Sequence, residues 1–144
     1  MTLRAWVTAW SGTWSGAEDL FVPDHDGPLT GHATLLITPV LAGRAMTFDY
    51  AHWAGDRALI QTHSTVYDTG HGLRLHWIAD QAGEALIYHG QAIADGLQFD
   101  RSAGPAMKRL RLTVPGDMLE LTALTISGGQ ERPTRRARLT RARA

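Results

Sequence analysis

The chain has 144 residues, of which 44% are apolar and 19% are charged, and it contains no cysteine. This length suits one globular domain with a buried core, and the composition excludes a disordered chain, disulfide bonds, thiolate nucleophiles and zinc–thiolate sites. The formal charge is zero, although six of the 14 basic residues lie in the last 13 positions, where an arginine-rich end could contact nucleic acid. No aromatic residue lies among these arginines to stack on bases, so we interpret them as a solvated edge strand and tail and expect no nucleic-acid partner.

The longest apolar runs are only a few residues, which is too short to span a bilayer, so we expect no membrane partner. The N-terminal stretch has one arginine, Arg4, and becomes polar from Ser11 onward. It lacks the charged region, apolar stretch and cleavage pattern of a signal peptide, which predicts a cytoplasmic protein. We expect one domain over residues 1–144, with a helix in residues 1–11, a barrel in residues 13–141 and a tail in residues 142–144.

Residues 2–11 predict a short amphipathic helix. Their apolar side chains recur at the i, i+3, i+4 and i+7 positions of one helical face, namely Leu3, Trp6, Val7 and Trp10. Thr2 precedes them and can serve as the N-cap. Two tryptophans on one stripe need an apolar surface to cover, so this helix is expected to be a plug over a core rather than a ligand box.

From Thr13 onward the apolar period changes to two, and turn residues recur about every 8–12 positions, which is typical of an all-β barrel or sandwich. Turn chemistry is clear at Asp26-Gly27-Pro28 and at Pro115-Gly116-Asp117. The predicted strands are Thr13–Phe21, His32–Val40, Arg44–Trp53, Ala58–Asp68, Leu73–Ala79, Glu84–Gly90, Gly96–Asp100, Met107–Val114, Met118–Thr125 and Thr134–Thr140.

The short connections between these strands predict antiparallel neighbours in an up-and-down order. A meander of this length would leave exposed edges unless the sheet closed on itself. The predicted fold is therefore a single all-β, up-and-down antiparallel barrel of about eight to ten strands, with the short N-terminal helix plugging one end.

Several strands mix polar and large apolar side chains on one face. One such row is Met46, Phe48, Tyr50 and His52, and another is Leu59, Gln61, His63, Thr65 and Tyr67. An inner wall of this kind is typical of a barrel with a ligand cavity, and a patchily polar outer face gives the same pattern. The sequence leaves open which face of each strand points inward.

Four short motifs lie at the beginnings and ends of the predicted strands. They are Gly12-x-Trp14-x-Gly16 at the start of the first strand, Pro39 with Gly43 and Arg44, the pair Tyr67-Asp68, and the strand-turn Trp77…Asp80…Gly83. With a preceding helix and a basic last strand, this order resembles the calycin superfamily, which includes lipocalins, fatty-acid-binding proteins and nitrobindins. It resembles more closely an uncharacterised bacterial family of lipocalin-like small barrels, over essentially the whole chain.

The resemblance implies that Trp14 packs across the closed end of the barrel beneath an arginine of the last strand. The two candidates are Arg138 and Arg141. Arg141 shares the alternation of Ala137 and Leu139, so we expect it to be the partner. The barrel closure is then formed by Gly12, Trp14, Gly16 and Arg141.

Two features depart from members of the superfamily. Fatty-acid-binding proteins carry a pair of lid helices between their first two strands, whereas residues 22–30 form a loop too short for two helices. Nitrobindin-like haem proteins carry their haem-ligating histidine in the last part of the chain, and no histidine follows His89. We therefore expect no cofactor.

Seven histidines suggest a metal site, but none pairs at a known metal-binding spacing. His63 could share a cavity with His76 or His89, where three imidazoles could bind zinc. Because single histidines on strands more often lie on the surface or in a hydrogen-bonded wall, we predict no metal site.

The plausible acid–base groups are His63, Tyr67, Asp68, His76, Tyr88, Asp49 and Tyr50. Of these, the candidate catalytic residues are His63, Tyr67, His76 and Tyr88. The two tyrosines are more often core aromatics with a satisfied hydroxyl. Asp68 precedes Thr69-Gly70 and is predicted to cap a turn.

The leading hypothesis is that the barrel cavity binds a small, largely apolar molecule, with few polar groups to orient it. The predicted ligand-binding residues are Phe48, Tyr50, His63, Tyr67, Trp77 and His89. The alternative is a small-barrel enzyme, such as an isomerase, cyclase or decarboxylase, using histidine and tyrosine acid–base groups in the same cavity. A third hypothesis is a packed barrel that acts through its surface, with an exposed strand pairing two copies as a homodimer.

Overall fold

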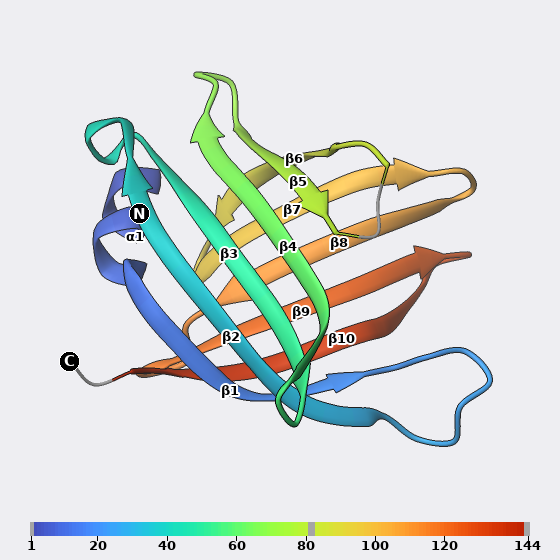
Figure 1. The fold of residues 1–144 in the computed structure, drawn as a ribbon. Coiled ribbons are helices and arrows are strands. Elements are labelled where there is room, and N and C mark those ends of the chain that lie inside the picture. Colours follow the sequence, from blue (N-terminus) through green and yellow to red (C-terminus); the bar gives the residue numbers. More distant parts are fainter. Residues whose placement is uncertain (1, 81–82, 143–144) are drawn as a thin grey trace.

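Residues 2–80 and 83–142 are described by a computed structural model. Within them the chain forms one α-helix, one 3-10 helix and ten strands (Figure 1). The bounds are α1 Leu3–Trp10, β1 Gly12–Leu20, β2 Leu29–Val40, η1 Leu41–Gly43, β3 Ala45–Ala54, β4 Arg57–Asp68, β5 Leu73–Ala79, β6 Leu86–Ile93, β7 Gly96–Ala103, β8 Ala106–Thr113, β9 Met118–Ser127 and β10 Gln130–Arg141.

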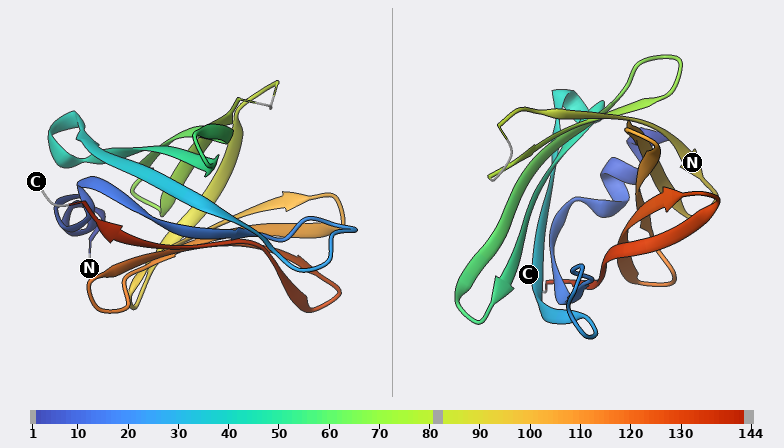
Figure 2. Two further views of the ribbon diagram at one scale, coloured as in Figure 1. Left: turned by 60° about the horizontal axis from the view of Figure 1, so that its bottom comes forward. Right: turned by 90° about the vertical axis from the view of Figure 1, so that its right-hand side faces the viewer.

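The strands form one closed antiparallel barrel, in which each strand pairs with its neighbours along the chain and β1 closes on β10. Figure 1 shows β1 between β2 and β10, and Figure 2 shows the strands around a common interior. The predicted all-β, up-and-down antiparallel barrel is confirmed, with ten strands and a single short N-terminal helix. Closure pairs β1 on both sides, so neither end of the meander leaves an open sheet edge.

The predicted strand bounds differ from the observed ones mainly at turns. The segment Leu73–Ala79 has the predicted bounds, whereas β10 begins at Gln130 rather than at Thr134. The reason is the turn Gly128-Gly129, where φ is 58° and 76°, because two positive φ values allow a tight hairpin in which pairing resumes at once. Met1, the predicted turn residues 81–82 and tail residues 143–144 lie outside the described residues.

Two glycines permit close approaches inside the barrel. A Cβ atom on Gly16 would lie 2.0 Å from the carbonyl oxygen of Arg138 on β10. A Cβ atom on Gly31 would lie 2.5 Å from Nε2 of His52 on β3. Both distances are below any non-bonded contact, so these positions let a neighbouring strand and an imidazole ring pack directly on backbone.

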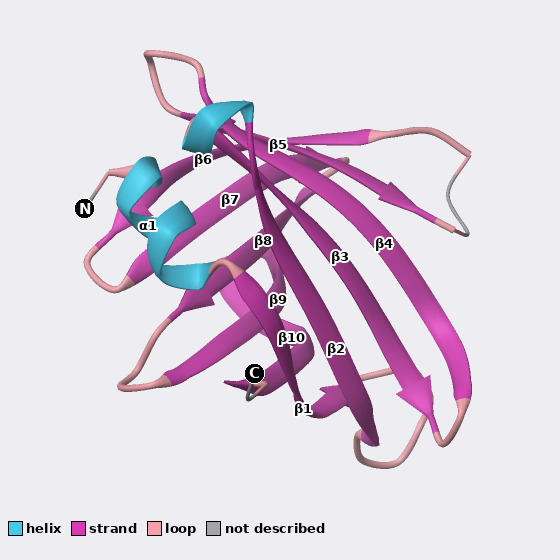
Figure 3. Cartoon of the chain, turned by 60° about the vertical axis from the view of Figure 1, so that its left-hand side comes forward, coloured by secondary structure: helices cyan, strands magenta, loops and turns pink. Residues whose placement is uncertain are grey.

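The N-terminal helix α1 covers one end of the barrel (Figure 3). The Thr2 hydroxyl accepts a hydrogen bond from the backbone N–H of Ala5, as an N-cap does. The apolar stripe of the helix is buried, and its two tryptophan rings lie 4.7 Å apart between centroids. No helix among the described residues is long and apolar enough to cross a membrane.

The apolar core occupies the half of the barrel next to α1. Its largest fully buried apolar side chains come from the helix and from seven of the strands, namely Trp10, Phe99, Leu35, Ile37, Met46, Leu75, Leu97, Leu112, Leu119 and Leu139. Close packing of these side chains supplies most of the apolar burial that stabilises the barrel. The other half of the barrel is not filled by side chains and contains a cavity.

Candidate functional site

The end of the barrel next to α1 is sealed by Trp14 and Arg141. The Trp14 indole is 3% exposed, and its Nε1 donates to the carbonyl oxygen of Trp10 at 2.8 Å. The guanidinium carbon of Arg141 lies 4.4 Å from the centre of the Trp14 ring, and its nitrogens donate to the carbonyl oxygens of Ala9 and Ser11. One side chain therefore ties the last strand to the helix and to the first strand.

A cavity of about 480 Å³ occupies the opposite end of the barrel. Its walls come from β1 and from β4 to β10, together with residues 21–23 of the β1–β2 connection. Most of the lining is apolar, including Leu20, Phe21, Ile60, Trp77, Leu86 and Leu110. A smaller space of about 30 Å³ lies deeper and shares Trp77, Leu110 and Arg135 with it. The volume of the larger cavity, about 480 Å³, is in the range of sites for small organic molecules.

A buried polar cluster lies in the wall of this half of the barrel. Glu18 is 0% exposed, and its Oε1 accepts hydrogen bonds from the Tyr50 hydroxyl and from His52, whose Nδ1 is 2.7 Å away. Its other oxygen, Oε2, lies 3.8 Å from Nε of Arg135. The Arg135 guanidinium is stacked over the Tyr50 ring at 4.7 Å, so Tyr50 and Arg135 separate Glu18 from the interior space that they both line.

Burial dominates the electrostatics of this cluster. It raises the pKa of Glu18 above its ordinary value of 4.5, although Arg135 and His52 act in the opposite direction. Burial also lowers the pKa of Arg135, against the attraction of Glu18 and Tyr88. Both shifts have the same cause: the protein interior solvates the charged forms of Glu18 and Arg135 less well than water does.

Two further cations, Arg101 and Lys108, line the cavity. The Arg101 guanidinium lies 5.5 Å from the centre of the Tyr88 ring, and Nζ of Lys108 donates to the hydroxyl of Thr125 at 2.9 Å. Burial raises the pKa of Tyr88, while Arg101 and Arg135 oppose that shift. The hydroxyl of Tyr88 therefore stays protonated and can donate a hydrogen bond.

Four of the predicted site residues point into the barrel. Phe48 and Tyr50 of β3 line the deep space, Tyr88 of β6 lines the larger cavity, and Trp77 of β5 lines both. The Trp77 and Tyr88 rings stack with centroids 5.7 Å apart, and the buried Nε1 of Trp77 has no hydrogen-bond partner within residues 2–80 and 83–142.

The other predicted site residues lie on the outer face of the barrel, which corrects the expectation that they line the cavity. The four are His63 and Tyr67 of β4, His76 of β5 and His89 of β6. On β4 the inward positions are Ser64 and Val66, because these face Phe48 and Met46 of the neighbouring strand. On β5 and β6 the inward residues Trp77 and Tyr88 leave the adjacent histidines outside.

On the outer face these side chains bond to neighbours on adjacent strands. Nδ1 of His63 lies 2.6 Å from Oδ1 of Asp49, and the two side chains are 50% and 52% exposed. The Tyr67 hydroxyl lies 3.0 Å from Nε2 of His76. Both pairs are cross-strand contacts; the Asp49–His63 pair is exposed to solvent and contributes little stability, whereas the Tyr67–His76 pair is partly buried.

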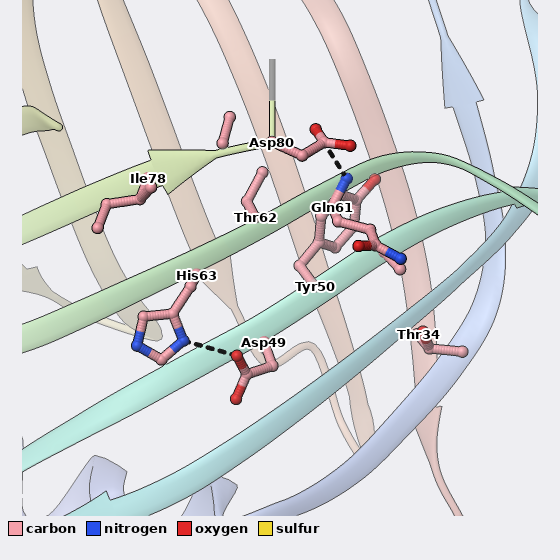
Figure 4. A pocket seen from close by; sticks show the side chains of 10 residues that line it. Thr34, Asp49, Tyr50, Gln61, Thr62, His63, Ile78 and Asp80 are labelled. Carbon is pink, nitrogen blue, oxygen red and sulfur yellow. Dashed lines mark hydrogen bonds and ion pairs between the residues drawn. The ribbon is translucent and has the colours of Figure 1, made fainter. Parts of the chain in front are cut away.

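A shallow groove of about 460 Å³ surrounds the Asp49–His63 pair (Figure 4). Oδ1 of Asp80 accepts a hydrogen bond from the backbone N–H of Gln61 there, at 3.3 Å. The pair has the geometry of an oriented base, but the groove contains no serine or cysteine as a nucleophile. Within residues 2–80 and 83–142 no three histidine, aspartate or glutamate side chains converge as a metal site would require.

Four inward charged residues were not among the predicted site residues: Glu18, Arg101, Lys108 and Arg135. A signal existed for Glu18, because Trp14, Gly16 and Glu18 alternate on one face of β1. Arg135 likewise shares the parity of Arg141 on β10. Extending the alternation from the closed end would have placed both side chains inside the barrel.

Fold and site together define a small closed β-barrel that is packed at one end and hollow at the other. The crystal structure of Rv2717c from M. tuberculosis is similar to this chain, with a TM-score of 0.70 and 15% sequence identity over 99% of both chains. At this identity the likeness shows the fold alone. No family model matches the chain, and no curated protein matches it significantly.

Proposed function

We propose that this barrel binds a small, largely apolar molecule in the cavity at the end opposite α1. The observation that carries the proposal is the contrast within one barrel. Its half next to α1 is filled with side chains, whereas the other half contains about 480 Å³ of space with mostly apolar walls. Proteins usually fill apolar interiors to high density, so a space of this size in a small domain favours a ligand site.

The arrangement of the wall supports the same proposal. Trp77, Leu86 and Leu110 supply apolar surface from three different strands, and Tyr88 places a hydroxyl among them. A few polar groups on an apolar wall orient a ligand while burial supplies affinity. The resemblance of the chain to calycins, whose barrels carry apolar ligands, agrees with this use of the fold.

Filling the cavity tests the proposal. Ala123 of β9 lines the cavity, and its neighbour Thr122 lines a groove on the outer face. With the neutral fluorophore N-phenyl-1-naphthylamine as probe, we expect saturable binding by the wild type and by Thr122→Trp, and loss of binding by Ala123→Trp. Circular dichroism melts check that both variants fold. Wild-type protein that takes up no probe, together with native mass spectra that show no bound molecule, would contradict the proposal.

The alternative of a small-barrel enzyme has less support. Of its four candidate residues, Tyr88 faces the cavity, while His63, Tyr67 and His76 lie on the outer face. An acid–base enzyme in this cavity would have to use Tyr88 or the buried Glu18 instead, and Glu18 is screened from the cavity by Tyr50 and Arg135.

A further inference from the structure

Of the four cationic side chains that line the cavity, three lie on the inner faces of three strands: Arg101 of β7, Lys108 of β8 and Arg135 of β10. Arg101 and Lys108 are direct partners in the β7–β8 register. They lie on the inner face, because the adjacent pair Asp100 and Arg109 bond to each other on the outer face. Like charges directly opposite each other on neighbouring strands destabilise the pair, so this wall is not optimised for stability.

The carboxylates near the cavity do not balance these charges. No aspartate or glutamate is among the described residues that line it. The fourth lining cation, Arg109, is already paired, with Nε 2.7 Å and Nη2 3.0 Å from the two oxygens of Asp100. Among the described residues only Glu18 forms an ion pair with one of the other three, Arg135, at 3.8 Å. One carboxylate therefore faces three cations.

Some hydrogen-bond donors of the cavity wall also lack an acceptor among the described residues. Nε of Arg101 and Nε1 of Trp77 are buried and have no hydrogen-bond partner among the described residues. Lys108 donates to a neutral hydroxyl, that of Thr125. Buried donors without acceptors cost free energy, and an acceptor-rich group in the cavity would remove that cost.

Building on the binding function proposed above, we propose that the ligand is an amphipathic organic acid. Its anionic group, a carboxylate, sulfonate or phosphate ester, binds to Arg101, Lys108 and Arg135. Its apolar body lies against Trp77, Leu86 and Leu110.

Neighbouring aromatic rings hold the two guanidinium groups in place. Arg101 lies over Tyr88, and Arg135 lies over Tyr50. A planar guanidinium held this way keeps its donors in a fork that matches an acid group, and less entropy is lost when the acid binds. Glu18 sits behind Arg135 and stabilises its charge before the ligand arrives.

A matched pair of probes tests the charge preference. 1-Anilinonaphthalene-8-sulfonate has the ring system of N-phenyl-1-naphthylamine and adds one sulfonate. We expect the wild type to bind the sulfonate at least about tenfold more tightly, since charge-assisted hydrogen bonds are the strong ones. We also expect that preference to weaken as salt is raised. Equal affinities for the two probes would overturn the inference.

Charge-removing variants locate the site. Arg101→Met and Lys108→Met keep an unbranched apolar side chain but remove its charge, and should each lower sulfonate affinity about tenfold or more, with neutral-probe affinity unchanged. The control is Arg111→Met, because Arg111 is on β8 with Lys108 but bonds to Gln98. Loss of both probes equally in Arg101→Met and Lys108→Met would mean that these residues only shape the cavity, and would overturn the inference.

A competition series identifies the acid. Decanoate, decyl phosphate and decanesulfonate should each displace the neutral probe better than decanol, and the strongest of them names the acid group. Decanol competing as well as all three acids would overturn the inference while leaving the binding function intact. Absence of any binding, by acids, decanol and neutral probe alike, would instead refute the binding function itself.

Discussion

The two ends of this barrel are built from the same strands, but their interiors are packed differently. At the end next to α1, Trp14 is covered by Arg141 and donates to Trp10, and the interior is filled. At the other end the interior is hollow, and of the cations Arg101, Lys108 and Arg135 that line it only Arg135 forms an ion pair with a carboxylate among the described residues. The difference indicates that stability is concentrated at one end, and that the other end retains unfavourable electrostatics.

The largest expected effect is at the sealed end. Trp14→Ala should lower the free energy of unfolding by about 3–5 kcal/mol, because a fully packed aromatic leaves a cavity. Trp77→Ala should cost clearly less, since Trp77 already borders empty space. Urea denaturation of both variants measures the difference. Equal losses would show that the two ends are equally packed.

A smaller effect separates two arginines of β10. Arg141→Met should cost about 1–2 kcal/mol, because it removes the contact with Trp14 and the bonds to two carbonyl oxygens. Arg138→Met removes an exposed pair with Glu120 and should cost less than about 1 kcal/mol. Thermal melts of the two proteins test this, and a costlier Arg138 variant would contradict the sealing role of Arg141.

At the hollow end, Glu18 is expected to make the stability of the protein depend on pH. The folded-state pKa of Glu18 is raised, so between 4.5 and that pKa the folded protein binds more protons than the unfolded chain. The contribution of Glu18 to stability therefore falls as pH rises through this window. Glu18→Gln removes this dependence, so its stability relative to wild type should increase from acid toward neutral pH. The free energy of unfolding of both proteins is measured by urea denaturation at a series of pH values. If the two curves run parallel, Glu18 does not titrate in this range.

The smallest expected effect is a gain in stability, whereas most substitutions lower the free energy of unfolding. Lys108→Met should raise the free energy of unfolding by about 0.2–1 kcal/mol, because it removes a like charge directly opposite Arg101. Arg111→Met, on the outer face of the same strand, should give no gain. A Lys108 variant that is less stable than wild type would mean that its bond to Thr125 outweighs the repulsion.

Most of the fold could be predicted because its signals are local. Alternation with a period of two and glycine-rich turns gave all ten strands, and the short turns gave their order. The inward face of β4 could not be predicted this way, because a row with Leu59 and Tyr67 is as apolar as a row with Ile60 and Val66. The choice is made by the partner strand, where Val66 meets Met46.

The site was harder to predict for a related reason. A glutamate on the face of Trp14 is improbable in an apolar interior unless its partners are known. The partners Tyr50, His52 and Arg135 come from β3 and β10, far from Glu18 in the sequence. The β1–β2–β3 meander brings Tyr50 and His52 to Glu18, and the pairing of β1 with β10 brings Arg135.

The pairing of β1 with β10 also has a consequence for the order of folding. Trp14 faces Arg141 across that pair, so the first strand gains its second neighbour only after β10 has been synthesised (Figure 1). Closing so long a loop costs entropy before any contact repays it, which slows folding in proteins dominated by distant contacts. A nascent chain that stops short of β10 has an unpaired first strand, and its Glu18 lacks Arg135. The barrel can therefore close only after β10 has been synthesised.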